Sequence, residues 1–366
     1  MVKAGQSGKG IVLMVILQKM ITSSLIRTTL LSLFILISLF SFFTLIDQLE
    51  DTRGNYGTIE ALVYTLMTMP RMSYEMFPIA AVIGSMAVFG LLTRNNELDV
   101  ILTSGLSRFN LVTILVRSSI ILVIFAVLIG ELVAPYSEER AQTLRSLALS
   151  ENISLKTRNG FWIRDGNSYV NIRRVLPGNH IEDIYFYEFD EAHNLRSSFH
   201  AQSADYENGQ WIMEDINETL LNDASIESRH HVRAGWDSLI DPEIINIVTI
   251  KPQFLTMLGL ANYINYLRQN AQNALLYEQA LWVKLITPFT IISMIVLAVP
   301  LVQGRIRETN VGYQVFVGAM IGILFHFINQ ISLNAGVVYN IPPSISVTAP
   351  TLILIAVIIY LLRRKV

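Results

Sequence analysis

Six stretches of this chain are long and apolar enough to cross a lipid bilayer as helices, and no other feature constrains the fold as strongly. A bilayer core about 30 Å thick needs roughly 20 mainly apolar residues, because each residue advances a helix by about 1.5 Å. The stretches that qualify are residues 28–46, 76–92, 111–133, 280–302, 311–333 and 344–362. We therefore expect an α-helical membrane protein with six transmembrane helices.

The composition agrees with this class and excludes others. Of the 366 residues, 52% are hydrophobic and 15% are charged, whereas a globular chain carries roughly 25% charged residues. A formal net charge of −2 provides no basic excess for nucleic-acid binding, so we expect no nucleic-acid partner. Because cysteine is absent, disulfides, thiol catalysis and cysteine-ligated metal sites are excluded.

Three charged residues fall inside the apolar stretches. Arg117 lies near the start of the third stretch, Glu131 near its end, and Lys284 near the start of the fourth. A charge at the bilayer centre costs roughly 2.5–3.5 kcal/mol on insertion scales, so placement near a membrane surface is the economical solution. We expect the long side chain of Arg117 to reach the head-group region.

The distribution of lysine and arginine around the stretches predicts their orientation, since cytoplasmic loops are enriched in both residues. The basic residues on one side are Lys3, Lys9, Lys19, Arg27, Arg94, Arg108, Arg305, Arg307, Arg363, Arg364 and Lys365. The short loops on the other side carry Arg53 and Arg71. We expect both termini in the cytoplasm and the long polar segment outside it.

That polar segment, residues 136–277, has the composition of a soluble domain. After a helical lead-in it contains short β-rich runs at 161–175, 184–189, 195–206, 211–221, 226–235 and 244–250. Turn signals such as Asp165-Gly166-Asn167 and Asn208-Gly209 separate the runs, which favours a β-sandwich or an open jelly roll. The expected domains are an N-terminal transmembrane region (1–135), the β domain (136–277) and a C-terminal transmembrane region (278–366).

A short amphipathic helix is predicted at about 95–105, between the second and third stretches. Its residues of interest are Glu97, Leu98, Asp99, Ile101 and Leu102. The two acidic residues lie in the first turn, where the helix dipole favours negative charge, and the three aliphatic residues share one face. The helix either offers acidic groups to a cytoplasmic partner or is an ordinary capped loop helix.

Polar residues near the outer membrane surface allow two interpretations. The fifth stretch contains His326, Asn329, Gln330, Ser332 and Asn334, and polar groups at this depth must find partners. Hydrogen bonds between helices are the commoner explanation, and a ligand head group is the alternative. Similarly, Arg140 and Arg145 in the helical lead-in either meet a lipid phosphate or pair with Glu138 and Glu139.

No catalytic motif is present. The patterns GxxxxGK[ST], GxSxG and HExxH do not occur, and the histidines lack metal-ligand spacing. We therefore expect that the chain is not an enzyme and holds no cofactor or metal of its own. One function that the topology would serve is that of a membrane-anchored envelope assembly or sensor protein, whose external β domain binds envelope proteins.

Several short strings, read in order, point to a different function. These strings are Leu45-Ile46-Asp47-Gln48-Leu49; Asn96-Glu97-Leu98 with Ser104-Gly105; Gly130-Glu131 with Val133-Ala134-Pro135; Gly160-Phe161-Trp162 with Asp165-Gly166-Asn167; Asn262-Tyr263 with Tyr266-Leu267; Trp282, Lys284 and Pro288; and Ile341-Pro342-Pro343. In this combination the chain resembles the permease subunits of the lipopolysaccharide export ABC transporter, the LptF/LptG family, and within that family it is LptG-like. The resemblance extends from about Ile26 to the C-terminus.

The resemblance implies a bacterial inner-membrane protein with six spans and an inserted periplasmic β-jellyroll. It implies a non-catalytic permease subunit that extracts lipopolysaccharide from the outer leaflet of the inner membrane and passes it to a periplasmic bridge. The implied partners are an LptF-like second permease, an LptB-like ATPase dimer that binds ATP and Mg, an LptC-like single-span protein and an LptA-like periplasmic bridge.

The resemblance also assigns roles to residues. It makes the helix at 95–105 a coupling helix, in which Glu97 contacts a basic residue of the ATPase. It matches Arg145 to an arginine that is associated with lipid phosphates. The family's LptG members often carry lysines near the outer end of the first span, whereas Thr44, Glu50 and Asp51 occupy those positions here.

We therefore expect phosphate recognition to be altered: it is shifted to Arg53 or to the arginines after the third span, Arg140 and Arg145, or it is aimed at a differently charged lipid. Asn329 and Gln330 are the expected polar groups at the rim of a lipid cavity lined by the first and fifth spans. The expected contacts of the acyl chains are Phe34, Phe40, Phe42 and Phe43.

Overall fold

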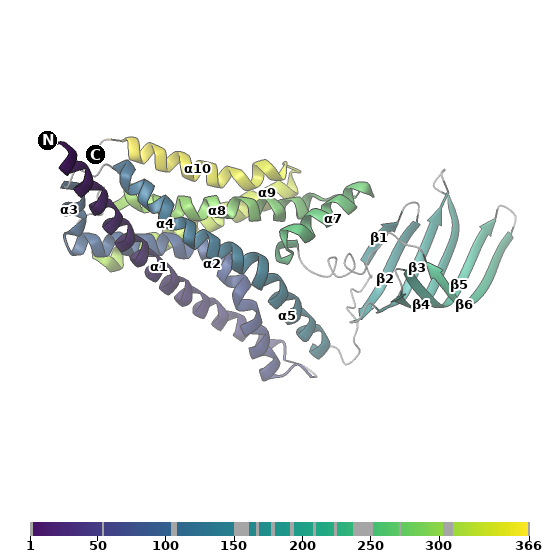
Figure 1. Ribbon diagram of the computed structural model, residues 1–366. Coiled ribbons are helices and arrows are strands. Elements are labelled where there is room, and N and C mark those ends of the chain that lie inside the picture. The colour runs from purple at the N-terminus through teal and green to yellow at the C-terminus, as the bar shows by residue number, and fades with distance from the viewer. Residues whose placement is uncertain are drawn as a thin grey trace. The chain divides into compact units, whose positions relative to one another are not determined.

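The structure of the chain is a computed structural model (Figure 1) that describes residues 3–52, 55–103, 108–149, 161–165, 168–176, 180–190, 194–207, 210–222, 225–236, 252–270, 272–302 and 310–364. The chain divides into two compact units. The helical unit comprises Met1–Asp47, Thr65–Glu138 and Leu275–Val366, and the β unit comprises Gln48–Tyr64 and Glu139–Ala274. The segment Gln48–Tyr64 thus belongs with the β unit rather than with the N-terminal transmembrane region.

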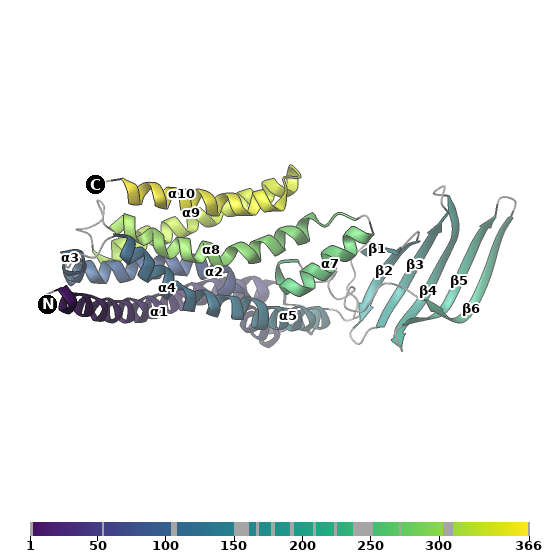
Figure 2. The same ribbon diagram turned by 45° about the horizontal axis from the view of Figure 1, so that its top comes forward.

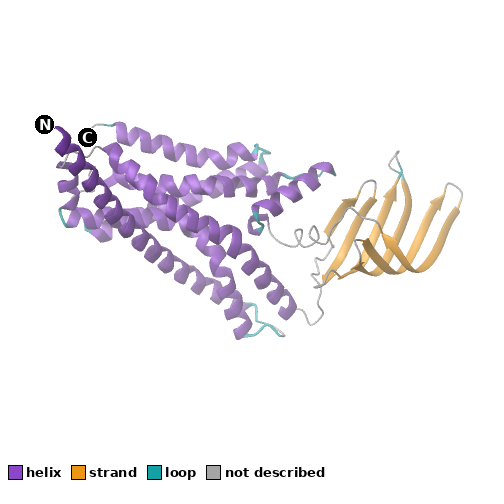
Figure 3. Cartoon of the chain, in the orientation of Figure 1, coloured by secondary structure: helices purple, strands orange, loops and turns teal. Residues whose placement is uncertain are grey.

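Helices account for most of the chain (Figure 3). In chain order they are α1 (Lys3–Glu50), α2 (Thr58–Arg94), α3 (Glu97–Thr103), α4 (Arg108–Leu128), the π-helical segment η1 (Ile129–Val133), α5 (Ala134–Leu149), the 3-10 turn η2 (Pro252–Phe254), α7 (Met257–Gln269), α8 (Leu275–Val302), α9 (Val311–Val338) and α10 (Pro343–Arg363). Among the described residues, six helical segments are long and apolar enough to cross a membrane, and each of them contains one of the six predicted stretches and extends beyond it. The prediction of six transmembrane helices is confirmed.

The helix α2 is the centre of the helical unit. Of its most apolar window 78% is buried, compared with 22% for α1 and 17% for α9. Glycines allow close approach to it: a Cβ on Gly84 of α2 would lie 2.6 Å from Cα of Thr29 in α1, and one on Gly318 of α9 would lie 3.2 Å from Cα of Ile83. Small residues at such crossings let helices pack by van der Waals contact where lipid provides no hydrophobic driving force.

Four further helices of the helical unit, α4, α8, α9 and α10, pack side by side, as two views show (Figures 1 and 2). The helix α8 contacts α4 on one side and α10 on the other, and α10 also contacts α9. The short helix α3 lies at the end of the helical unit where α1 begins and α10 ends (Figure 2). We call this the α3 end.

The β unit contains one antiparallel sheet in the order β1-β2-β3-β4-β5-β6. Its strands are β1 (Phe161–Asp165), β2 (Ser168–Leu176), β3 (His180–Phe189), β4 (Leu195–Glu207), β5 (Gln210–Asn222) and β6 (Ser225–Trp236). Each described strand pairs with its neighbour in sequence, so their order is that of a meander, and the Greek-key crossover of a closed jelly roll is not among them. The inserted β domain is confirmed, and the predicted run at 244–250 lies outside the described residues.

Apolar side chains from β1 to β5 form the core of the sheet. The buried members are Ile163, Val170, Ile172, Ile181, Ile184, Phe186, Ala201, Ala204, Trp211, Met213 and Ile216. In β3, β4 and β5, however, two buried residues are three positions apart: Ile181 and Ile184, Ala201 and Ala204, and Met213 and Ile216. The positive φ of Asp183 and of Asp215, which lie between the residues of two of these pairs, interrupts the strict alternation of a strand there. The last strand is different, because residues 226–233 of β6 are exposed.

Candidate functional site

The helix α3 begins after a two-residue turn that ends α2. Asn95 N–H donates to Leu91 O (3.0 Å) and Asn96 N–H to Thr93 O (3.1 Å). Asn96 has a positive φ of 58°, a conformation that asparagine tolerates better than most residues. The amide of Asn95 also donates to Glu97 Oε1 at 3.3 Å. This short joint ties the position of α3 to the end of α2.

The apolar face of α3 is buried in the helical unit. Leu98 is 2% and Ile101 is 4% exposed, and both belong to the core cluster that includes Leu25 of α1 and Phe89 of α2. The face toward the surface carries Val100, which is 67% exposed, and the half-buried Glu97. A force on this surface would therefore reach the core through two anchored side chains.

The predicted helix at 95–105 is shorter in the structure, since α3 covers Glu97–Thr103 and residues 104–107 lie outside the described residues. The backbone positions of Asp99 and Leu102 fall within α3, and their side chains lie outside the description.

The four candidate phenylalanines of α1 are all exposed. The exposed fractions are 68% for Phe34, 41% for Phe40, 59% for Phe42 and 55% for Phe43. Because an α-helix turns by about 100° per residue, Phe34 and Phe43 point to opposite sides of α1. The four side chains can all contact acyl chains or a neighbouring subunit, but they do not form a single wall.

The polar residues of α9 divide into two groups. Ser332 donates to Ser346 O of α10 at 2.6 Å, and Gln279 of α8 donates to Leu333 O at 2.7 Å. These are the interhelical hydrogen bonds expected for polar groups at this depth. Asn329 is half-buried and Gln330 is exposed, and neither forms a hydrogen bond with another residue that the structure describes.

Charged groups pair at the end of the helical unit opposite α3. Arg71 of α2 donates to Glu138 Oε2 at 3.0 Å and to Glu75 Oε1 at 3.1 Å, and the side chain of Glu138 is only 1% exposed. Lys284 of α8 forms an ion pair with Glu131 of η1 and donates to Gly130 O at 3.2 Å. The side chain of Lys284 is 4% exposed, so its charge depends on these partners.

Sequence reasoning placed Glu131 and Lys284 near a membrane surface but missed their pairing. The available signal was that two adjacent spans each carry a single charge of opposite sign near the same predicted surface. The alternative pairing of Arg145 with Glu138 is wrong, because Glu138 pairs with Arg71.

In the β unit, Arg145 of α5 binds Asp51, with 2.7 Å between Nη2 and Oδ2. Its guanidinium carbon lies 5.6 Å from the centre of the Tyr64 ring, and its Nε is buried without a hydrogen-bond acceptor among the described residues. Arg140 is exposed, and Arg53 lies outside the described residues. Asp51 is thus the partner of the arginine that the family resemblance associates with lipid phosphates.

The segment that carries Asp51 is held by a buried tyrosine. Tyr56 is 1% exposed and donates its hydroxyl to Gln48 Oε1 at 2.9 Å. Burial raises the pKa of Tyr56 above its usual value, although the nearby charge of Arg145 opposes the shift. The hydroxyl therefore stays a hydrogen-bond donor at neutral pH.

The histidines of the sheet pair with acidic neighbours. His200 lies 2.8 Å from Asp183 Oδ1, and His180 lies 2.6 Å from Asp205 Oδ1. Burial alone would raise the pKa of Asp183, but hydrogen bonds from His200 and Tyr185 and the charge of Arg173 together lower it. The described residues contain no group of three or more side chains placed to hold a metal ion.

Comparison with known proteins places these features in one family. Residues 19–364 match the family described as lipopolysaccharide export system permease LptF/LptG. The chain belongs to this family. It is 30% identical over 352 residues to the lipopolysaccharide export system permease protein LptG of Haemophilus influenzae, covering 95% of this chain and 98% of that protein.

A second relative agrees. The chain is 31% identical over 354 residues to the lipopolysaccharide export system permease protein LptG of Escherichia coli K12, covering 96% of this chain and 98% of that protein. The chain is therefore an LptG-like permease, a non-catalytic transport component and a multi-pass protein of the inner membrane. The expectation of an LptG-like permease is confirmed.

Proposed function

We propose that this permease extracts lipopolysaccharide from the outer leaflet of the inner membrane and passes it to a periplasmic bridge, driven by ATP hydrolysis in a partner subunit. The observation that carries the proposal is the construction of α3: a short surface helix, joined by two residues to the buried helix α2 and anchored by Leu98 and Ile101. Membership in the family favours this function over that of an anchored sensor protein.

Coupling would begin at Glu97. Its carboxylate lies at the start of α3, next to the exposed Val100, and can accept a charge-assisted hydrogen bond from a basic residue of an LptB-like ATPase dimer. That dimer would hold the ATP and Mg. Because α3 cannot move independently of α2 without stretching a two-residue joint, closure of the dimer would displace the centre of the helical unit.

The proposed orientation of the helices in the membrane rests on where their basic residues lie. Lys19, Arg27, Arg94, Arg363 and Arg364 all lie toward the α3 end of their helices. This bias is the one that cytoplasmic loops show. The proposal therefore places α3 and both termini in the cytoplasm and the β unit in the periplasm.

Two exposed surfaces fit the proposed partners. The helices α1 and α9 are the least buried of the spans, at 22% and 17%, and an LptF-like second permease could cover part of their apolar surface. In the β unit the exposed strand β6 ends the described sheet. An added strand can extend such an edge, which would suit an LptC-like single-span protein or an LptA-like bridge.

Lipid phosphates would be met by Arg145, Arg140 and Arg53, with Asn329 and Gln330 as polar groups at the rim. In support, Arg140 is exposed, and Arg145 has a buried Nε without an acceptor among the described residues. A phosphate would compete with Asp51 for the guanidinium of Arg145, because both bind it through oxygen acceptors. The substrate would thus be admitted by exchange of one anion for another.

The test is Glu97→Gln in the complex reconstituted in liposomes with its companion subunits. Loss of one charge-assisted hydrogen bond, about 1.5–3 kcal/mol, should lower ATP-driven lipopolysaccharide release about 10-fold or more. The control Glu139→Gln makes the same chemical change on an exposed residue of α5 and should release lipid at the wild-type rate. Release by Glu97→Gln at the rate of this control would contradict the coupling role.

A further inference from the structure

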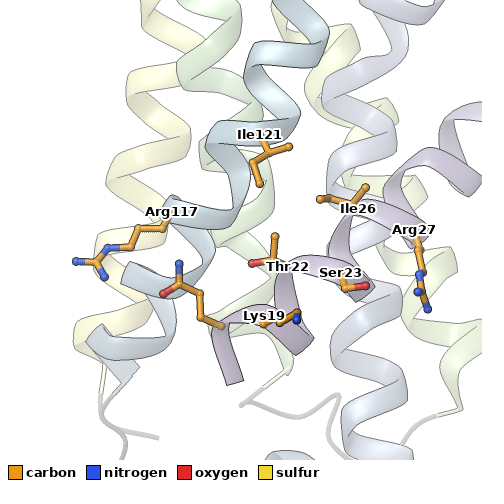
Figure 4. Close-up of a pocket in the computed structure, with 8 residues that line it drawn as sticks. Lys19, Thr22, Ser23, Ile26, Arg27, Arg117 and Ile121 are labelled. Carbon is orange, nitrogen blue, oxygen red and sulfur yellow. The ribbon is translucent and has the colours of Figure 1, made fainter. Parts of the chain in front are cut away.

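A pocket of about 560 Å³ lies between α1 and α4, toward the α3 end of the helical unit (Figure 4). Three of its lining residues are positively charged: Lys19 and Arg27 on α1, and Arg117 on α4. Gln18, Thr22 and Ser23 add polar groups, Ile26 and Ile121 add apolar ones, and none of the described residues that line the pocket is acidic. The function proposed above leaves this pocket without a role.

The three charges lack protein partners among the residues that the structure describes. All three side chains are exposed, and none of them forms an ion pair with a described acidic group. In Figure 4 Arg117 and Arg27 lie on opposite sides of the pocket, with Lys19 between and below them, and the ends of both arginine side chains point outward. Arginine and lysine side chains turn about several single bonds, so these exposed groups can swing toward an anion that enters the pocket.

A hydrogen bond holds the two walls of the pocket together. Thr22 Oγ1 of α1 lies 2.6 Å from Ser118 Oγ of α4, and Ser118 is 1% exposed. Ser118 also donates to Ile114 O within α4 at 2.8 Å. This bridge fixes α1 against α4 next to Arg117, so basic residues from two separate helices line the same pocket.

The depth of Arg117 indicates what kind of anion is expected. The apolar part of α4 begins near residue 111, so Arg117 lies about 9 Å along the helix beyond that start. A charge at this depth is costly unless a partner or the head-group layer compensates it. A basic pocket between membrane helices on the cytoplasmic side is the kind of site that binds anionic lipid head groups.

We propose that this pocket binds the phosphate-bearing head group of an anionic glycerophospholipid from the cytoplasmic leaflet. The proposal rests on the orientation given above. The guanidinium groups of Arg117 and Arg27 can each donate two parallel hydrogen bonds to phosphate oxygens, and Gln18 and Ser23 can bond to head-group hydroxyls. Ile26 and Ile121 would contact the first methylene groups of the acyl chains.

The experiment uses the full chain, purified with the subunits that accompany it, and measures bound lipid by native mass spectrometry. The probes are phosphatidylglycerol and phosphatidylcholine, offered in equal amounts in detergent. Wild type should retain phosphatidylglycerol in preference. Since each basic residue near a membrane surface contributes about 1 kcal/mol to binding an anionic lipid, Arg117→Gln and Arg27→Gln should each weaken retention about 5-fold.

Control variants distinguish the effect of basic residues in this pocket from the effect of basic residues elsewhere at the same end of the helical unit. Arg363→Gln removes an exposed basic residue at the same end of the helical unit and should retain the lipid as wild type does. Arg117→Lys keeps the charge, so it should weaken the retention of phosphatidylglycerol by no more than about 2-fold. Lys19→Gln, on α1, gives the same readout as Arg117→Gln if that variant aggregates.

Three results would overturn the proposal: equal retention of the two lipids by wild type, equal loss in Arg363→Gln and Arg117→Gln, or displacement of phosphatidylglycerol by millimolar inorganic phosphate. The last would assign the pocket to a free phosphate. If a companion protein covers the pocket in place of lipid, wild type will retain phosphatidylglycerol and phosphatidylcholine equally. Lipopolysaccharide release, measured in parallel, shows whether the proposed function fails with this inference or independently of it.

Discussion

Replacing Lys284 with methionine removes an ammonium group from the helical unit and keeps most of its aliphatic stem. The side chain of Lys284 is 4% exposed, and that of its partner Glu131 is 21% exposed. The change would leave Glu131 without its cation and Gly130 O without the donor that lies 3.2 Å away. The variant therefore tests whether the pair is a requirement of the folded state or an accidental contact.

The expected loss is large. Removing one partner of a buried ion pair costs about 3–5 kcal/mol, and the partial exposure of Glu131 favours the lower end of that range. At about 2 °C per kcal/mol for a large chain, the midpoint of thermal unfolding should fall by on the order of 5–10 °C. The measurement is thermal unfolding of the purified protein in one detergent at a fixed scan rate.

The second variant makes the test decisive. Lys284→Met combined with Glu131→Gln removes both charges, so no unpaired carboxylate remains, and it should recover at least half of the lost midpoint. Leu285→Met, on the exposed side of the same helical turn, should leave the midpoint within about 1 °C of wild type. A double variant that is no more stable than Lys284→Met would refute the reasoning.

Three further predictions concern packing, pH and lipid binding. Gly84→Ala should lower the thermal midpoint, because its Cβ would lie 2.6 Å from a backbone carbon of α1, a clash that costs about 1–3 kcal/mol, whereas Gly312→Ala, with nothing within 4 Å, should not. The lowered pKa of Asp183 contributes stability that is complete above the carboxylate's unfolded pKa and is lost as pH falls through its folded pKa; weaker protection of the amides of β3 and β4 below pH 4, relative to their intrinsic exchange rates, should show this, and Asp183→Asn should lack the dependence. Asp51→Asn should free Arg145 and raise the affinity for a phosphorylated lipid about 3–10-fold, measured by lipid binding in detergent, whereas Arg145→Gln should lower it.

Each of these predictions has an outcome that contradicts it. Equal midpoints for Gly84→Ala and Gly312→Ala would mean that α1 moves aside without cost. Acid-induced exchange that persists in Asp183→Asn would assign the dependence to another group. Unchanged lipid affinity in Asp51→Asn would show that Asp51 does not compete with the phosphate.

The sequence predicts the spans and the strands well because both depend on local patterns. A run of about 20 apolar residues rarely forms anything other than a membrane helix, and each of the six runs lies in a helix that is long enough to cross the membrane. In the sheet, turn residues and alternation fix the strands closely, as in β4, expected at 195–206 and found at Leu195–Glu207. The meander order required tertiary pairing that alternation does not encode.

Pairing between distant residues is what the sequence cannot supply. Lys284 and Glu131 are more than 150 positions apart, and their contact depends on how α8 packs against α4. Likewise, Glu138 had two plausible arginines nearby in sequence but pairs with Arg71 of α2. The role of the phenylalanines of α1 stays a prediction, and their spacing of six, two and one residues spreads them around the helix.

The π-helical segment η1 has a consequence for these charges. The N–H of Ala134 bonds to Ile129 O, five residues earlier, so the segment holds one residue more than an α-helical turn would. Deleting one residue there would rotate α5 by about 100° relative to α4. Glu131 could then face Lys284 only if Glu138 turned away from Arg71. The additional residue sets the rotation of the helix so that two of its carboxylates each face a basic residue on a different neighbouring helix.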